Sequence, residues 1–82
     1  MDFKASKSID CCGQLCPVPI LMTEEVWSGL GTGAVLEVLF TDPGAEPDLR
    51  AWCRARGEEW LGARRHGTVH HAWLRRLTQK GK

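Results

Sequence analysis

Hydrophobic and polar positions follow two different periods along the 82-residue chain, and these periods predict six secondary-structure elements. Short runs of β-forming residues predict strands, and apolar residues three or four positions apart predict helices. In chain order the predicted elements are strand Ser8–Cys12, helix Cys16–Leu30, strand Val35–Thr41, helix Glu46–Arg56, strand Glu59–Arg65 and strand Thr68–Leu77. Because two helices cover one sheet face economically, we expect an α+β fold: a two-layer α/β sandwich in the order β-α-β-α-β-β, with a four-stranded mixed sheet and both helices on one face.

The first predicted helix has two apolar faces. The stripe expected to face the core consists of Ile20, Thr23, Trp27 and Leu30. Three further apolar residues lie off that stripe, near Cys16, and are expected to be partly exposed: Val18, Leu21 and Met22. In the second helix the core stripe is Leu49, Trp52 and Cys53, with Arg50 and Arg54 pointing outward.

The last strand is ambiguous in register. One of its faces carries Val69, His71, Trp73 and Leu77, and the other carries His70, Ala72, Leu74 and Arg76. A slip of one residue would exchange these two faces, so the pattern does not decide which one meets the helices. Trp60 or Trp73 is expected to be exposed on the uncovered face of the sheet, where a partner would dock.

Composition narrows the class of protein. Hydrophobic residues make up 43% of the chain, which argues against disorder, and no apolar run approaches the length of a membrane span. The first ten residues lack the apolar core of a signal peptide, so a cytoplasmic location is the default expectation. We expect one domain over residues 1–82, with flexible tails at residues 1–6 and 79–82.

Charge is unevenly distributed along the chain. Residues 1–49 hold two lysines and eight acidic residues, a net charge of −6, whereas residues 50–82 hold nine basic and two acidic residues, a net charge of +7. Either this asymmetry marks a docking face, or the charges intermix on folding. The overall charge of +1 and the absence of an aromatic RNA-binding motif argue against direct nucleic-acid binding.

The candidate chemistry centres on Cys16. At the start of a helix, unpaired backbone N–H groups and the helix dipole favour an anion, so we expect a lowered thiol pKa and a nucleophilic thiolate. A persulfide at this position is also an anion and gains the same stabilisation. Pro17 and Pro19 fall in the first turn, where a missing N–H costs little, and they stiffen the backbone around the sulfur.

The segment around Cys16 resembles the signature of the TusA-like (SirA-type) sulfur-carrier family. The pattern D-x-x-G-x-x-C-P-x-P is carried by Asp10, Gly13, Cys16, Pro17 and Pro19. The resemblance covers nearly the whole chain, since Thr41-Asp42-Pro43 and the second helix, with Asp48-Leu49 and Trp52-Cys53, also match the family pattern. The family fold is the same β-α-β-α-β-β sandwich.

This resemblance implies a sulfurtransferase that works by a cysteine persulfide on Cys16, as a carrier rather than a multiple-turnover enzyme. Sulfur would arrive from a cysteine desulfurase or a rhodanese-like donor and leave to a downstream accepting protein, by a tRNA-thiolation, molybdenum-cofactor or sulfur-oxidation route. No metal or organic cofactor is needed. The partner-docking surface is expected to be Val18, Leu21 and Met22 with Arg50.

Other roles for these residues stay open. Asp10 and Asp42 either orient the motif through hydrogen bonds or cap turns. Cys11 and Cys12 lie outside the motif; on a strand only one of them faces the core, and Cys12 is a candidate for a protective disulfide with Cys16. His70 and His71 are either a plain strand pair or include a general base, and Gly57-Glu58-Glu59 has Glu where many family members carry His.

The competing functional hypotheses are a non-catalytic regulatory or adaptor domain of the same fold, and a thiol redox module built on Cys12 and Cys16. A zinc site has enough candidate ligands among the Cys and His residues, but the paired C-x-x-C spacing is missing.

Overall fold

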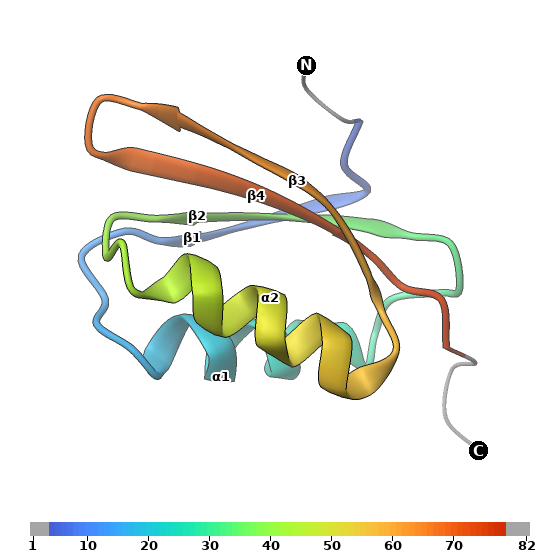
Figure 1. The fold of residues 1–82 in the computed structure, drawn as a ribbon. Coiled ribbons are helices and arrows are strands. Elements are labelled where there is room, and N and C mark those ends of the chain that lie inside the picture. The colour runs from blue at the N-terminus through green and yellow to red at the C-terminus, as the bar shows by residue number, and fades with distance from the viewer. Residues whose placement is uncertain (1–3, 79–82) are drawn as a thin grey trace.

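The computed structural model describes residues 4–78, and these form the six elements in the predicted order (Figure 1). The elements are β1 (Lys7–Cys11), α1 (Val18–Trp27), β2 (Val35–Phe40), α2 (Ala45–Arg56), β3 (Glu59–His66) and β4 (Val69–Arg75). Both helices pack on the same face of a four-stranded sheet (Figure 1), so the predicted two-layer α+β sandwich is confirmed. Neither helix has the length and apolar character to cross a bilayer within the described part of the chain.

The sheet has the strand order β1-β2-β4-β3. The β1–β2 pair is parallel, with α1 as its crossover, and the other two pairs are antiparallel, so the sheet is mixed as expected. Cys11 at the end of β1 pairs with Phe40 at the end of β2. The loops that leave these two strands therefore start side by side, and each leads into the N-terminus of a helix.

The core lies between the sheet and the helices and settles the register of β4. Ala72 and Leu74 are fully buried in the core cluster, so the face of β4 that they share meets the helices. The predicted helix stripes also contribute to this core: Trp27, Leu30, Leu49, Trp52 and Cys53 are buried, and Ile20 packs against them. Thr23 is buried too, and its hydroxyl donates to the carbonyl of Pro19.

The expectation of an exposed tryptophan on the open sheet face was wrong. Trp60 pairs with Leu74 in the sheet and packs against the core, because a bulge between Trp60 and Gly62 follows it. Trp73 points to the other face, yet only 3% of its surface is exposed, and the His71 ring stacks on it at 6.0 Å. Neither residue offers a free aromatic surface to a partner.

The first helix is shorter than predicted at both ends. Pro17 takes a non-helical conformation as the N-cap residue, and the Cys16–Pro17 peptide bond is cis. At the other end the amides of Gly29 and Leu30 bond to carbonyls three residues earlier, so α1 finishes in a tighter turn. Leu30 remains buried although it lies beyond the helix.

Two buried charged residues join the end of α1 to the rest of the fold. The Glu58 carboxylate accepts hydrogen bonds from the indole N–H of Trp27 (2.8 Å), from the amide of Leu77 (2.8 Å), and from the amide and hydroxyl of Thr78 (3.2 and 2.7 Å). The Arg76 guanidinium donates to the carbonyls of Trp27 and Leu30 and thereby satisfies the helix end. Burial alone would raise the pKa of Glu58, but the hydrogen bonds outweigh it and hold that pKa below its ordinary value.

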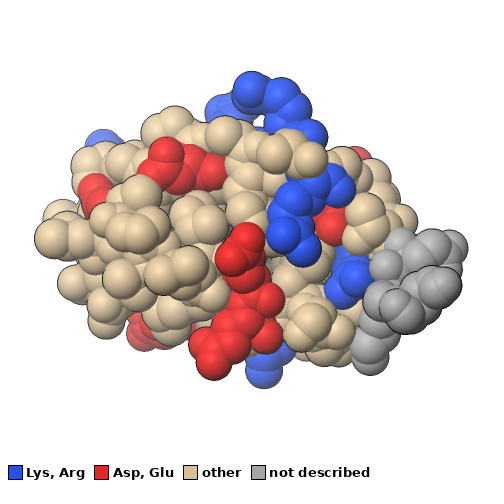
Figure 2. Space-filling model, turned by 90° about the horizontal axis from the view of Figure 1, so that it is seen from below, with Lys and Arg blue, Asp and Glu red and all other residues tan. Residues whose placement is uncertain are grey.

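The two halves of opposite net charge are interleaved by ion pairs. Glu24 on α1 lies 3.5 Å from Arg56 on α2, and Glu46 lies 3.6 Å from Arg50 within α2. Figure 2 shows acidic and basic side chains next to each other across the helix layer. Of the two predictions, a separate docking face or charges that intermix on folding, the second therefore holds where these pairs form.

Part of the predicted flexible tails lies outside the described residues, namely 1–3 and 79–82. Ser6 does not belong to a free tail, because its amide donates to the carbonyl of Val35 at 2.7 Å and its hydroxyl accepts from the amide of the same residue at 3.3 Å. These bonds extend the pairing of β1 with β2 by one residue.

Candidate functional site

Cys16 lies in the loop that joins β1 to α1, at the edge of the sheet where β1 and β2 end (Figure 1). Three hydrogen bonds fix this loop. The amide of Cys12 donates to Asp10 at 2.9 Å, the amide of Gly13 donates to the Thr41 hydroxyl at 2.8 Å, and the amide of Cys16 donates to Asp42 at 3.0 Å. The loop is thus held both by its own strand and by the loop that follows β2.

Two positions of the motif, one in the loop and one in the first turn of α1, depend on their residue type. Gly13 has a φ of +82°, in the left-handed region that side chains disfavour, and its amide makes the bond to Thr41. Pro19 is buried in the first turn of α1, where it sacrifices no helical hydrogen bond. The motif residues around Cys16 therefore shape the backbone that carries the thiol.

Asp10 and Asp42 differ in what they bind. Asp10 caps its own turn, since its carboxylate accepts a hydrogen bond from the amide of Cys12 two residues later. Asp42 does two things: one carboxylate oxygen accepts from the amide of Cys16, and the other accepts from the amide of Gly44 at 3.0 Å, just before α2. Asp42 therefore connects the Cys16 loop to the start of the second helix.

The electrostatic setting of Cys16 is the reverse of the sequence expectation. Cys16 lies before the N-cap residue Pro17, and its amide is already bonded to Asp42. Its thiol donates a hydrogen bond to the Asp48 carboxylate on α2. That bond, together with partial removal from water and the negative charges of Asp48 and Asp42, raises the pKa of the Cys16 thiol above its ordinary value. The predicted lowering of this pKa was wrong.

Asp48 is the functional neighbour that sequence reasoning missed. It is 32 residues from Cys16 in the chain and is brought to it by the packing of α2 beside α1. Asp48 belongs to the family pattern in the second helix, but no local spacing in the sequence indicates contact with the thiol.

The four cysteines are all free thiols, and they differ in access. Cys11 faces the core and is fully buried, whereas Cys12 points away and is half-buried. Burial raises the pKa of Cys11 and of Cys12, and it raises the pKa of Cys53, inside the core, to about 12. Only Cys16 is an exposed thiol, and the structure contains no disulfide between it and Cys12.

The apolar surface beside Cys16 is partly as expected. Leu21 is 56% exposed, Val18 is half-buried, and Met22 is half-buried with contacts to the core. Leu15, next to Cys16 and 72% exposed, belongs to the same surface although the sequence did not single it out. In Figure 2 uncharged side chains make up most of the end of the molecule where α1 begins, with acidic side chains beside them.

Arg50 lies apart from this apolar surface. Its guanidinium sits over the Trp60 ring, 5.4 Å from the centroid, and 3.6 Å from the Glu46 carboxylate. These contacts direct it toward β3, away from α1, so it is not joined to Val18 and Leu21 as the sequence suggested.

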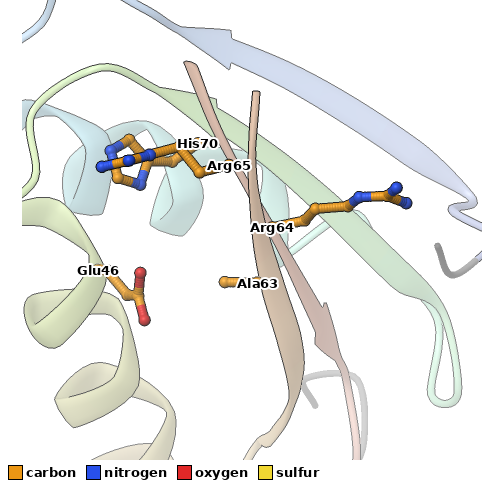
Figure 3. Close-up of a pocket in the computed structure, with 5 residues that line it drawn as sticks. All are labelled: Glu46, Ala63, Arg64, Arg65 and His70. Carbon is orange, nitrogen blue, oxygen red and sulfur yellow. The ribbon is translucent and has the colours of Figure 1, made fainter. Parts of the chain in front are cut away.

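The two histidines of β4 lie on opposite faces of the sheet. His70 stacks on Phe40, with centroids 5.0 Å apart, and lines an open hollow of about 320 Å³ between α2 and the β3–β4 hairpin, together with Glu46, Ala63, Arg64 and Arg65 (Figure 3). His71 bonds to Glu37 on the other face. In residues 4–78 no hydrogen bond joins either ring to Cys16. Neither histidine is therefore placed as a general base toward that thiol.

Metal binding has no geometric support in the described residues. Between Lys4 and Thr78 there is no group of three or more His, Cys, Asp and Glu side chains placed to hold a metal ion.

Comparison with known proteins adds to this geometry. A sequence model of the family described as Sulfurtransferase TusA matches residues 7–76. The putative sulfur carrier protein YrkI of Bacillus subtilis is 36% identical over 73 residues, which cover 89% of this chain and 97% of that protein. The sulfur carrier protein TusA of Allochromatium vinosum is 30% identical over 70 residues, covering 85% of this chain and 92% of that protein.

Two further similarities concern length and fold. The putative sulfur carrier protein YrkF of B. subtilis is 38% identical over 73 residues, and this chain covers 89% of its own length but only 40% of that longer protein. The crystal structure of a SirA-like protein from Desulfitobacterium hafniense superposes with a TM-score of 0.78 at 22% identity, over 88% of this chain and 99% of the other. This likeness shows a shared fold.

Proposed function

This chain belongs to the TusA sulfurtransferase family, and from that premise we propose that Cys16 accepts sulfane sulfur as a persulfide and passes it to a partner protein. The observation that supports the proposal most strongly is that Cys16 is the exposed thiol among the four cysteines, on a loop fixed by Asp10, Thr41 and Asp42.

The transfer needs no net oxidation. The Cys16 sulfur attacks the outer sulfur of a donor persulfide, the donor S–S bond breaks, and the donor leaves as a thiol after taking up the proton that Cys16 gave up. Cys16 then carries the extra sulfur as S–SH. In the second step a thiol of the accepting protein attacks that outer sulfur, and Cys16 returns to its thiol form.

Partners of two kinds fit this chemistry. The donor is a cysteine desulfurase or a rhodanese-like protein, and the acceptor is a downstream protein of a tRNA-thiolation, molybdenum-cofactor or sulfur-oxidation route. We propose that both dock on the apolar surface formed by Leu15, Val18 and Leu21 beside Cys16, because a partner that binds there would bury these side chains. A reducing cytoplasm is the compartment in which four free thiols persist.

A pulse–chase experiment tests the relay. The chain is loaded with a cysteine desulfurase and ³⁵S-labelled cysteine, separated from the donor, and mixed with an accepting thiol on a carrier protein. We expect label to be retained by the chain until the acceptor is added and then to move to the acceptor. A chain that binds the desulfurase but never carries label would instead be an adaptor, and the proposed function would be contradicted.

A further inference from the structure

The Cys16 thiol and the Asp48 carboxylate are held against each other by one shared residue. Asp42 binds the amide of Cys16 with one carboxylate oxygen and that of Gly44 with the other, and its own carbonyl accepts from the amide of Ala45 at 2.9 Å, where α2 begins. Asp48 stands in the first turn of α2. Its neighbour Leu49 is fully buried and anchors that turn on the core. The hydrogen bond from thiol to carboxylate is therefore set by the fold.

The thiol that donates this hydrogen bond must lose its proton during sulfur uptake, and the carboxylate that accepts the bond is placed to take that proton. Next to Asp48 and Asp42 the thiol keeps its proton at neutral pH, yet only the deprotonated sulfur attacks a persulfide efficiently. The proton must leave as the new S–S bond forms. The carboxylate of Asp48 already accepts the hydrogen bond from that sulfur, whereas the rings of His70 and His71 are engaged with Phe40 and Glu37.

We propose that Asp48 is the proton acceptor for Cys16 during sulfur uptake, an inference that rests on the proposed function. The proton passes from the Cys16 sulfur to Asp48 as the sulfur attacks the outer sulfur of the donor persulfide. The donor S–S bond breaks, the donor sulfur leaves with the bonding electron pair, and the proton on Asp48 is then given to it. Cys16 ends as a persulfide, the donor ends as a thiol, and Asp48 ends as a carboxylate.

Asp48→Asn separates this role from a merely electrostatic one. The amide keeps the shape of the side chain but is neutral and a very poor base. Removal of the charge lowers the pKa of Cys16, which is measured from the pH dependence of the ultraviolet absorbance of the thiolate. Sulfur uptake from glutathione persulfide is slower, by about 100-fold at pH 7, the lower end of the usual contribution of general acid–base catalysis. A lower thiol pKa combined with slower sulfur uptake therefore distinguishes proton transfer to Asp48 from a purely electrostatic effect of its charge.

The pH profile provides the second readout. The ratio of variant to wild-type uptake at each pH cancels the titration of glutathione persulfide. This ratio rises with pH, because a thiolate formed in solution needs no built-in acceptor. Asp48→Glu, which keeps a carboxylate, recovers part of the rate at pH 7. The matched control is Glu46→Gln, two residues earlier on α2, whose carboxylate faces Arg50 at 3.6 Å; it leaves the Cys16 thiol pKa and the rate of sulfur uptake unchanged.

Each result has a defined meaning. Uptake by Asp48→Asn at the wild-type rate or faster across the pH range, in a variant with a wild-type unfolding midpoint, overturns the inference and leaves sulfur carriage on Cys16 intact. If Asp48→Asn unfolds, Asp48→Glu is measured instead, because it keeps a carboxylate but displaces it. Uptake that is slower than in the wild type at pH 7 and approaches the wild-type rate as the pH rises supports the role, whereas a ratio of rates that does not change with pH contradicts it. Failure of the wild type to take up sulfur on Cys16 contradicts the proposed function, and the inference with it.

Discussion

Cys16→Ser is expected to reduce sulfur uptake by at least about 10³-fold, which is the scale seen when an enzyme loses its nucleophile. A serine hydroxyl does not form a stable bond to sulfane sulfur under these conditions. The other thiols cannot replace Cys16, because Cys11 and Cys53 are buried in the core and Cys12 is half-buried with a raised pKa. Intact mass after incubation with a cysteine desulfurase and cysteine measures the gain of one sulfur atom.

Cys12→Ser is the matched control for that experiment. Cys12 is four residues away in the same loop, so its replacement perturbs the loop to a similar degree without removing the exposed thiol. We expect this variant to gain sulfur at close to the wild-type rate. Uptake that survives in Cys16→Ser but disappears in Cys12→Ser would move the carrier role to Cys12 and would favour a redox module built on that thiol.

Glu58→Gln is expected to lower the free energy of unfolding by about 2–4 kcal/mol, since hydrogen bonds to a charged group contribute about 1.5–3 kcal/mol each and the site is buried. The amide oxygen retains two of the four bonds, those from Trp27 and the Thr78 hydroxyl, while the amide N–H₂ meets the backbone N–H donors of Leu77 and Thr78. The junction between the end of α1, the start of β3 and the residues after β4 is weakened. Urea-induced unfolding followed by tryptophan fluorescence measures the change.

The lowered pKa of Glu58 determines how the free energy of unfolding changes with pH. Because the pKa of Glu58 is lower in the folded chain than its ordinary value, its stabilising contribution is complete above that ordinary value and is lost as the pH falls through the folded value. The wild type therefore loses stability on the acid side in part through Glu58, and Glu58→Gln shows a smaller loss over that range.

Glu59→Gln is the control for the stability measurement. Its carboxylate lies 3.2 Å from Arg75, with the two side chains 41% and 42% exposed, so the pair contributes less than about 1 kcal/mol. A Glu58→Gln variant as stable as Glu59→Gln would show that the buried hydrogen bonds of Glu58 are not needed to join these segments.

The fold was predictable because most of its helices and strands have clear local signals in the sequence. The β-forming run Val35–Phe40 and the stripe of Leu49, Trp52 and Cys53 are strong signals that tertiary packing did not override. The register of β4 was not predictable, since its two faces carry equally mixed residues, and only packing of Ala72 and Leu74 on the helices decides between them. The bulge in β3 beside Trp60 was also missed, although a glycine inside a strand, here Gly62, is a local sign of a bulge.

The site was predictable only as far as its contacts are local. The segment from Asp10 to Pro19 was identified from the sequence because its motif residues are close together in the chain. The pKa of Cys16 depends on Asp48, 32 residues away, and the reasoning from helix ends alone therefore gave the wrong sign. Glu58, read in the sequence as a departure from the family pattern, is explained by its bonds to Trp27 and Thr78.

The most direct measurement is the location of the transferred sulfur in the wild-type chain. After incubation with a cysteine desulfurase and cysteine, thiols and persulfides are alkylated, and the peptide that contains Cys11, Cys12 and Cys16 is fragmented in the mass spectrometer. We predict one additional sulfur atom on Cys16, with Cys11 and Cys12 alkylated as plain thiols. Additional sulfur on Cys11 or Cys12 with none on Cys16, or no additional sulfur at all, would contradict the assignment of Cys16 as the carrier.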